Sequence, residues 1–261
     1  MVTGENKTES RSERNSPLAE YSSSILSIDI GDKTVKFGVF EIDSEVVTIL
    51  DEIPVNQSSS SIYFQERNEF NKVIIIQSDA GYKLDPKALS KKSTVFSVQN
   101  EIPAINGLLS FSESENVISL KQIFPGAEVK HFMSDFIEGI IHRTRFLKGV
   151  RLYAHIEAEL IHVVSVANGK LLSAVTESIE DNSDMIYHLL SRVELNEFNQ
   201  LDDTLILSGN IEIGVESYKI LKNYIKDVQL NKGFRYQKVN SDYSNVPKQK
   251  FFSIINSFQC V

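Results

Sequence analysis

The chain has 261 residues, of which 41% are hydrophobic and 24% are charged, and its formal net charge is −8. This composition is typical of a globular protein with a substantial core, and the acidic balance argues against nucleic-acid binding, which requires a basic surface. The single cysteine, Cys260, excludes an intrachain disulfide and a four-cysteine zinc site, and no apolar run of about 18 residues predicts a transmembrane helix.

The first 22 residues are rich in Ser, Glu, Asn and Arg and contain few apolar side chains. Such a segment cannot bury enough surface to offset the entropy of ordering, so residues 1–22 are predicted to form a disordered leader. The segment lacks the apolar core of a signal peptide. The expected compartment is therefore the cytoplasm, with no membrane association.

Ordered structure is predicted to begin with three short strands at 24–30, 34–41 and 45–50. The first turn contains Gly31, Asp32 and Lys33, and the second contains Asp43 and Ser44. Short β-type runs joined by tight turns are typical of an antiparallel meander.

The same pattern returns at 151–156, 160–166 and 170–176, where Asn168 and Gly169 form a strong hairpin signal. When the two meanders are aligned, Asp29 corresponds to His155 and Gly31 to Glu157, an offset of 155 − 29 = 126 residues. The sequence therefore indicates a repeat at the scale of a whole domain.

Each meander is followed by alternating helices and strands. In the first half we expect helices at 58–70, 112–124 and 133–142 and strands at 72–77, 94–98 and 105–111. In the second half we expect helices at 182–198, 215–225 and 249–258 and strands at 204–207 and 234–239. The predicted fold is α/β, with a mixed sheet and packed helices built twice.

A repeated three-stranded meander with an Asp-x-Gly turn resembles the actin, Hsp70 and sugar-kinase superfamily, which has a ribonuclease H-like fold. The chain also resembles an uncharacterised bacterial family with this fold, through segments at 169–172, 184–190, 207–212 and 250–254. The resemblance implies lobe I at 23–149, lobe II at 150–240, and a C-terminal helix at 241–261 that returns to lobe I.

In that superfamily one turn from each lobe holds the phosphates of ATP, and a carboxylate on the first strand organises Mg²⁺. By resemblance Asp29 would be this metal-organising residue, and Gly31 would let the backbone approach a phosphate. Asp32, Lys33 and Thr34 would complete the first turn. The adenosine-contacting turn would be formed by Gly209 and Asn210, which follow a predicted strand.

The second turn departs from the superfamily pattern because His155 and Glu157 replace the expected Asp and Gly. Histidine removes a hard oxygen ligand for Mg²⁺, and glutamate places a negative charge where phosphate oxygens should lie. No compensating cation for Glu157 is evident in the sequence, since Lys33 belongs to the opposite turn. These replacements predict a weak or vestigial nucleotide site.

Three functions remain open at this point. The leading hypothesis is a non-catalytic actin-like pseudo-ATPase that acts as a binding or scaffold protein. Its cleft or outer surface would recognise a protein partner, a second copy of itself or a small molecule. The alternative is an ATPase or switch with a divergent phosphate site, in which Asp29 holds the metal and Glu157 is a base. A nuclease of the ribonuclease H-like type would need several clustered carboxylates, of which only Asp29 is a good candidate.

The remaining reactive side chains favour structural roles. His155 and His162 lie seven residues apart on successive strands, a spacing that can place them on different faces of the sheet. We therefore expect no histidine metal site. Cys260 lies at the end of the chain without a sheltered pocket or a base, so a packing role is expected.

Overall fold

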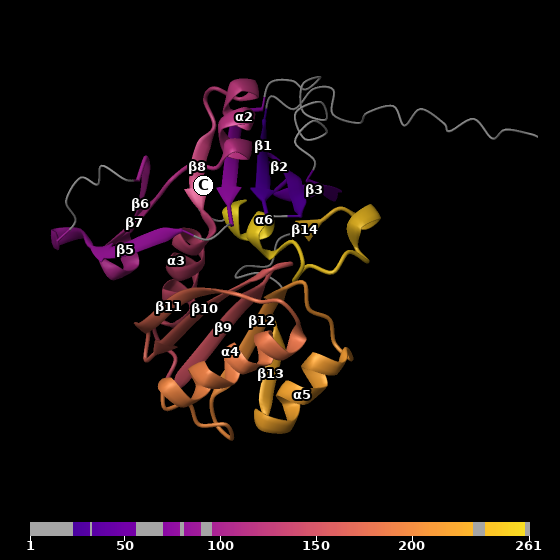
Figure 1. Cartoon of the computed structure of the whole chain (residues 1–261). Coiled ribbons are helices and arrows are strands. Elements are labelled where there is room, and N and C mark those ends of the chain that lie inside the picture. The colour runs from indigo at the N-terminus through magenta and orange to yellow at the C-terminus, as the bar shows by residue number, and fades with distance from the viewer. Residues whose placement is uncertain are drawn as a thin grey trace, which may run out of the picture.

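The computed structural model describes residues 23–31, 33–55, 70–78, 81–89, 96–231 and 238–258. It contains two large mixed sheets stacked end to end and a small antiparallel sheet beside them (Figure 1). The predicted leader at 1–22, nearly all of the predicted helix at 58–70, and Asp32 and Cys260 lie outside the described residues.

The first large sheet has the strand order β14-β3-β2-β1-β4-β8. Its meander consists of β1 (Ser24–Ile30), β2 (Thr34–Glu41) and β3 (Val46–Pro54), which pair in antiparallel fashion. The strands β4 (Lys72–Gln77) and β8 (Glu128–His131) extend it in parallel on one side, and β14 (Lys238–Val239) pairs with β3 on the other. All seven residues of β1 are buried, as expected for a strand covered on both faces.

The second large sheet repeats this plan with the order β11-β10-β9-β12-β13. Its meander consists of β9 (Val150–Ile156), β10 (Leu160–Ala167) and β11 (Lys170–Ser178). The parallel strands are β12 (Thr204–Gly209) and β13 (Asp227–Leu230). In both sheets the first meander strand has a parallel neighbour, so the duplication predicted from the sequence is confirmed.

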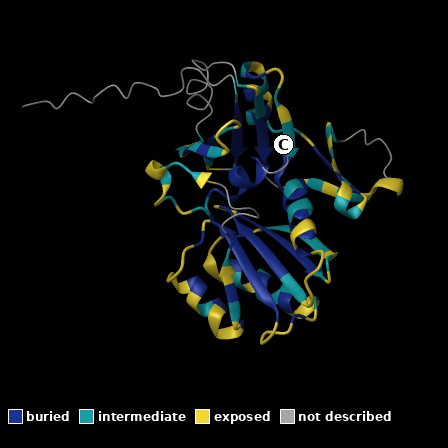
Figure 2. Ribbon diagram, turned by 180° about the vertical axis from the view of Figure 1, so that it is seen from behind, coloured by how far each residue is buried: buried dark blue, intermediate teal, exposed yellow. Residues whose placement is uncertain are grey.

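Helices cover the sheets on their outer faces and fill the space between them. The helices α4 (Asn182–Leu195) and α5 (Glu216–Tyr224) lie on the outer side of the second sheet (Figure 1), and Figure 2 shows the buried strands of that sheet from the opposite side. The helix α2 (Glu115–Ile123) packs on the first sheet, and α3 (Phe132–Thr144) runs from the first sheet toward the second (Figure 1). Within the described residues no helix is long and apolar enough to cross a bilayer.

The last helix, α6 (Phe252–Ser257), lies against β1, β2 and α3. Six consecutive side chains of α6 are buried, which is unusual for so short a helix and places it between the sheets. Gly38 on β2 makes this approach possible, because a Cβ atom there would lie 2.6 Å from Ile254 Cγ2. The predicted helix at 249–258 is therefore shorter than expected, since residues 248–251 form turns.

The small sheet, β5-β7-β6, differs most from the sequence-based expectation. It consists of β5 (Tyr82–Pro86), β6 (Val98–Ile102) and β7 (Gly107–Phe111). Short 3-10 helices follow β5 at Lys87–Leu89 and β6 at Pro103–Ile105. Another 3-10 helix lies later in the chain, at Ser241–Tyr243. The strand predicted at 94–98 in fact begins at Val98, the one predicted at 105–111 begins at Gly107, and β5 was not predicted. The division of the chain at residues 149 and 240 stays a prediction.

Candidate functional site

The acidic residue of the first predicted turn lies in the buried centre of the molecule. Asp29 is on β1 directly opposite Lys36 on β2, and such antiparallel partners share one face of the sheet. Asp29 is 2% exposed and Lys36 is 1% exposed. The face that they share is turned toward the second sheet, because Lys36 binds a residue that follows β9.

Asp29 is held by two hydroxyl groups. Ser78 Oγ donates to Asp29 Oδ1 at 2.5 Å, and Ser253 Oγ, from α6, donates to Asp29 Oδ2 at 2.5 Å. Burial, followed by the charge of Glu157, raises the pKa of Asp29 above its ordinary value, although Lys36 and the two serines act in the opposite direction. Each carboxylate oxygen of Asp29 therefore already accepts a hydrogen bond from another side chain of the protein.

Glu157 forms the contact between the two sheets. Lys36 Nζ lies 2.9 Å from both Oε1 and Oε2 of Glu157, and His155 Nε2 lies 2.7 Å from Oε1. The side chains of Lys36 and Glu157 are 2% and 9% exposed. The expectation that Glu157 lacks a compensating cation is wrong: the cation is Lys36, which the alternating pattern of its strand did not distinguish from a solvent-facing lysine.

The electrostatics of this pair favour both charged forms. Burial alone would raise the pKa of Glu157, but the Lys36 ammonium and the His155 hydrogen bond outweigh it and hold the pKa well below its ordinary value. Burial would likewise lower the pKa of Lys36, yet the charges of Glu157 and Asp29 raise it. The two groups therefore stabilise each other as an ion pair, since a buried charge is tolerated only when it is paired.

His155 is fixed by partners on both ring nitrogens. Its Nδ1 lies 2.9 Å from Ser208 Oγ on β12, and because the Glu157 carboxylate can only accept, the Nε2–H must donate to it. The serine, histidine and glutamate follow one another as in hydrolytic triads, but Ser208 is 1% exposed and His155 is 0% exposed. A substrate has no access to this serine, so the arrangement orients His155.

The two neighbouring strand histidines share a face of the second sheet. His155 pairs directly with His162 across β9 and β10, and their ring centroids lie 6.3 Å apart. The expectation that their spacing can separate them onto different faces is therefore wrong, because the short turn at 157–159 sets them opposite each other. Phe132 packs against both rings, at 4.4 Å and 5.0 Å. Among the described side chains no group of three His, Cys, Asp or Glu is arranged to hold a metal ion.

The two predicted phosphate turns face each other directly. The Gly31 N–H donates to Thr34 O at 3.0 Å, which closes the first turn, and a Cβ atom on Gly31 would lie 3.9 Å from Glu157 Oε2. Lys33 forms an exposed ion pair with Glu159 in the second turn. As arranged, these residues do not fit a magnesium-bound triphosphate, because Glu157 faces Gly31 and the oxygens of Asp29 are occupied.

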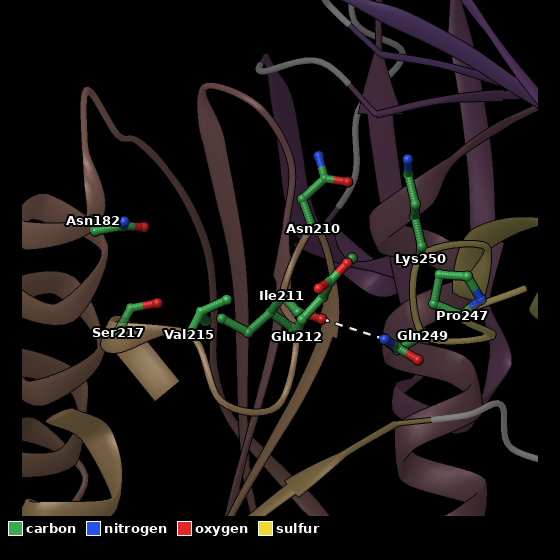
Figure 3. Close-up of a pocket in the computed structure, with 10 residues that line it drawn as sticks. Asn182, Asn210, Ile211, Glu212, Val215, Ser217, Pro247, Gln249 and Lys250 are labelled. Carbon is green, nitrogen blue, oxygen red and sulfur yellow. Dashed lines mark hydrogen bonds between the residues drawn. The ribbon is translucent and has the colours of Figure 1, made fainter. Parts of the chain in front are cut away.

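A pocket of about 280 Å³ adjoins the end of β12 and contains the other predicted turn (Figure 3). Gly209 has a φ of +83°, and a Cβ atom there would lie 2.0 Å from Ile156 O, so only glycine fits. The Gly209 N–H donates to Gln249 O at 2.8 Å, and Gln249 Nε2 donates to Ile211 O at 3.4 Å. The side chains of Asn210 and Lys250 project in the same direction at one end of the pocket (Figure 3).

The structure thus brings together most of the predicted site residues. Asp29, Gly31, His155 and Glu157 meet at the centre, whereas Gly209 and Asn210 line the adjoining pocket, and Lys33 and Thr34 lie at the rim. Four further polar residues hold this centre and were not predicted from the sequence: Lys36, Ser78, Ser208 and Ser253. The sequence contains one indication of Lys36, because it is a charged residue within the largely apolar strand β2.

Comparison with known families decides where the chain belongs. The sequence profile of one family, described as a protein of unknown function (DUF3822), matches residues 88–228, more than half of the 261 residues. The chain belongs to the DUF3822 family. No curated protein sequence matches this DUF3822 protein.

Two solved structures resemble the DUF3822 protein over most of its length. A Bacteroides thetaiotaomicron protein described as having an actin-like ATPase fold and unknown function has a TM-score of 0.71 and 20% identity, and the match covers 80% of this chain and 91% of that one. A chain of the PilM–PilN type IV pilus biogenesis complex has a TM-score of 0.61 and 10% identity, covering 93% and 99%. The DUF3822 protein therefore has the actin-like fold that the sequence resemblance implied.

Proposed function

We propose that this DUF3822 protein is a non-catalytic member of the actin-like fold that acts as a binding or scaffold protein. The observation that supports the proposal is the buried ion pair between Lys36 and Glu157. In the superfamily that the chain resembles, the phosphates of ATP lie between two turns. Here the Glu157 carboxylate of the second turn points toward Gly31 of the first turn, and Lys36 neutralises its charge.

The cost of opening this centre explains why a nucleotide would be a poor competitor. A triphosphate that entered between Gly31 and Glu157 would have to displace Glu157 from Lys36 and His155. Breaking a buried ion pair, so that a charge stays buried without its partner, costs on the order of 3–5 kcal/mol. The protein's own side chains therefore neutralise one another at the place where a nucleotide's phosphates would bind. They hold the two sheets together in the absence of a ligand.

A role in binding is consistent with one structural relative. The PilM–PilN complex shows that a protein of this fold can be part of an assembly, as its description states. A fold of this kind whose two halves are joined by internal charges presents a stable outer surface. We infer that the partner of this protein is another protein or a second copy of itself.

Nucleotide titration tests the proposal directly. Isothermal titration of the full-length protein with ATP and Mg²⁺ is expected to show no binding in the micromolar range and no hydrolysis. The matched variants are Glu157→Gly, which removes the buried carboxylate, and Glu159→Gly, which removes an exposed carboxylate from the same turn. Low-micromolar binding by the wild type, with hydrolysis that Asp29→Asn abolishes, would overturn the proposal.

The pocket beside β12 supports a second candidate, a nucleotide-dependent switch. Its lining of Gly209, Asn210, Gln249 and Lys250 offers amide groups and one cation within about 280 Å³. The α5 helix that borders it has no side-chain cap at its N-terminus, which leaves N–H donors for a ligand. According to this hypothesis the base and sugar of a nucleoside bind in the pocket beside β12, while Glu157 blocks the position of the phosphates. Adenosine binding that Asn210→Ala and Lys250→Ala weaken, with no gain from added phosphates, would favour this candidate.

A further inference from the structure

A second and larger cavity lies away from the charged centre. It encloses about 480 Å³ between the small sheet and the hairpin that joins β10 to β11. Its apolar walls are supplied by Leu84, Pro86, Ala104, Ile105 and Leu171. We call this cavity the hairpin groove. None of its residues belongs to the charged centre or to the pocket beside β12, so it is a separate site.

Two strands that border the hairpin groove each have an edge without a partner strand in the described part of the chain. The strand β5 pairs only with β7, and β11 pairs only with β10. The two strands approach each other where Thr176 Oγ1 lies 3.4 Å from Tyr82 Oη. An open strand edge beside an apolar groove suits an extended peptide, because the backbone can pair with the edge while alternate side chains enter the groove.

Cations lie beside the hairpin groove although the whole chain is acidic, and one carboxylate, that of Glu138, accepts from the backbone N–H of the lining residue Ala104. Lys170 is part of the lining, and the adjacent turn residue Gly169 packs on the backbone of Arg145, since a Cβ atom there would lie 2.8 Å from Arg145 Cα. Among the described residues Lys170, Arg145 and Lys148 form no ion pair. The one carboxylate in the lining, Asp85, is paired with Lys83 at 2.8 Å.

The loop at 145–148 also exposes apolar side chains next to these cations. Phe146 is 89% exposed, more than any other large hydrophobic side chain in the described residues, and Leu147 is 40% exposed. The Arg145 guanidinium lies 5.6 Å from the Phe146 ring centroid. Exposed aromatic and arginine side chains beside a groove are typical of protein interfaces, where such residues supply much of the binding energy.

We propose that the hairpin groove binds an extended, acidic peptide segment of a partner protein. The apolar side chains of the segment fill the groove, its backbone pairs with an open strand edge, and its carboxylates face Lys170, Arg145 and Lys148. A lipid surface is a poorer match, because a membrane needs neither a concave groove nor a strand edge. This inference rests on the proposed binding function and names the class of partner.

The test uses the full-length protein and a phage-displayed library of random twelve-residue peptides. Selected peptides are synthesised, labelled, and measured by fluorescence anisotropy. The expected peptides contain Asp or Glu beside branched or aromatic side chains, and their affinity falls as salt increases. Lys170→Glu and Lys148→Glu are expected to weaken binding at least tenfold each, since both replace an attraction by a repulsion at exposed positions.

Matched controls lie on the far helix α5. Lys222→Glu makes the same charge change as Lys170→Glu, and Tyr224→Ala, at a residue 53% exposed, removes an aromatic side chain as Phe146→Ala does. Both control variants are expected to bind the peptides like the wild type. Selected peptides without acidic residues, or equal binding by wild type and Lys170→Glu, would refute the proposal.

Three further outcomes distinguish the peptide proposal from a membrane-binding proposal and from the proposed non-catalytic function. Sedimentation of the wild type with phosphatidylserine vesicles, lost in Phe146→Ala and without selected peptides, would replace the peptide proposal by a membrane one. Peptide binding at the groove by a protein that also hydrolyses ATP would leave the groove proposal standing and refute the non-catalytic function. Failure of peptide selection in a protein that binds no ATP would refute the groove proposal alone.

Discussion

Lys36 and Glu157 are separated by 121 positions in the chain, and each oxygen of the glutamate lies 2.9 Å from the lysine nitrogen. This contact joins the first meander to the second at the point where their turns face each other. Its strength can be measured without knowing the partner of the protein.

The first prediction concerns the energy of this ion pair. Lys36→Met and Glu157→Gln are each expected to lower the free energy of unfolding by about 3–5 kcal/mol, because each leaves a buried charge without its ion-pair partner. The double variant is expected to recover a large part of that loss. Urea denaturation measures all three. The control pair Lys33→Met and Glu159→Gln, which is exposed, should change stability by less than about 1 kcal/mol. Additive losses in the double variant would contradict the prediction.

The second prediction concerns acid sensitivity. Burial, and then the neighbouring His155 and His131, lower the pKa of His162 to about 3, whereas its ordinary value is 6.5. The unfolded chain therefore binds a proton between pH 6.5 and pH 3 that the folded protein does not bind. Stability is complete above this window and is lost as the pH falls through it, by at most about 1.4 kcal/mol per pH unit from this residue.

The variant His162→Gln tests this dependence, because glutamine can still bond to Thr176 but does not titrate. Its unfolding free energy should vary less steeply than that of the wild type between pH 6.5 and pH 3. Identical slopes for the wild type and His162→Gln would show that another group governs acid unfolding.

The third prediction contrasts two glycines with positive φ. Gly209→Ala should be severely destabilising, because the new Cβ atom would lie 2.0 Å from Ile156 O in a backbone that is already left-handed. Gly214→Ala has the same kind of backbone, with a φ of +95°, but nothing lies within 4 Å of its Cβ. It should cost only the strain, about 1–2 kcal/mol. Thermal unfolding distinguishes them, and equal shifts in Tm would argue against the close approach of β9 and β12 at this point.

The fourth prediction contrasts two buried aspartates. Asp29 accepts from two serine hydroxyls, which can rotate and accept in turn, whereas Asp203 accepts from the backbone N–H groups of Val150 and Asn199. Asp29→Asn should therefore cost little at pH 7, because the repulsion from Glu157 that it relieves offsets the attraction to Lys36 that it loses. Asp203→Asn should cost about 1–3 kcal/mol, because an amide N–H would face a backbone donor. A larger loss for Asp29→Asn would show that its charge stabilises the fold.

The duplicated meanders could be predicted from the sequence because their cues are local. Apolar runs and turn residues mark β1 to β3 and β9 to β11, and the Asn168–Gly169 turn fixes one hairpin. The helices α3, α4 and α5 were predicted to within a few residues for the same reason. The strand β5 was not predicted, because its polar and charged residues gain a strand conformation only by pairing with β7.

The charged centre was predicted only in part, because its contacts are distant in sequence. Asp29 and Glu157 were found through the repeat, but Lys36 looked like any polar residue of an alternating strand. Ser253 is 224 positions from Asp29, and no local pattern relates them. His155 and Glu157 could be singled out from the sequence, because they replace the Asp and Gly found at the matching positions of the first meander. Lys36 lies on the other sheet and Ser253 on the last helix, and only the folded structure brings them to their carboxylate partners.

The position of α6 has a consequence for the order in which the molecule is made. A nascent chain that has emerged as far as residue 231 contains every strand of the second sheet. The first sheet still lacks β14 and the helix whose Ser253 binds Asp29 and whose Ile254 packs at Gly38. The first sheet is thus completed after the second, and Asp29 gains its second hydroxyl donor only after residue 253 has been synthesised.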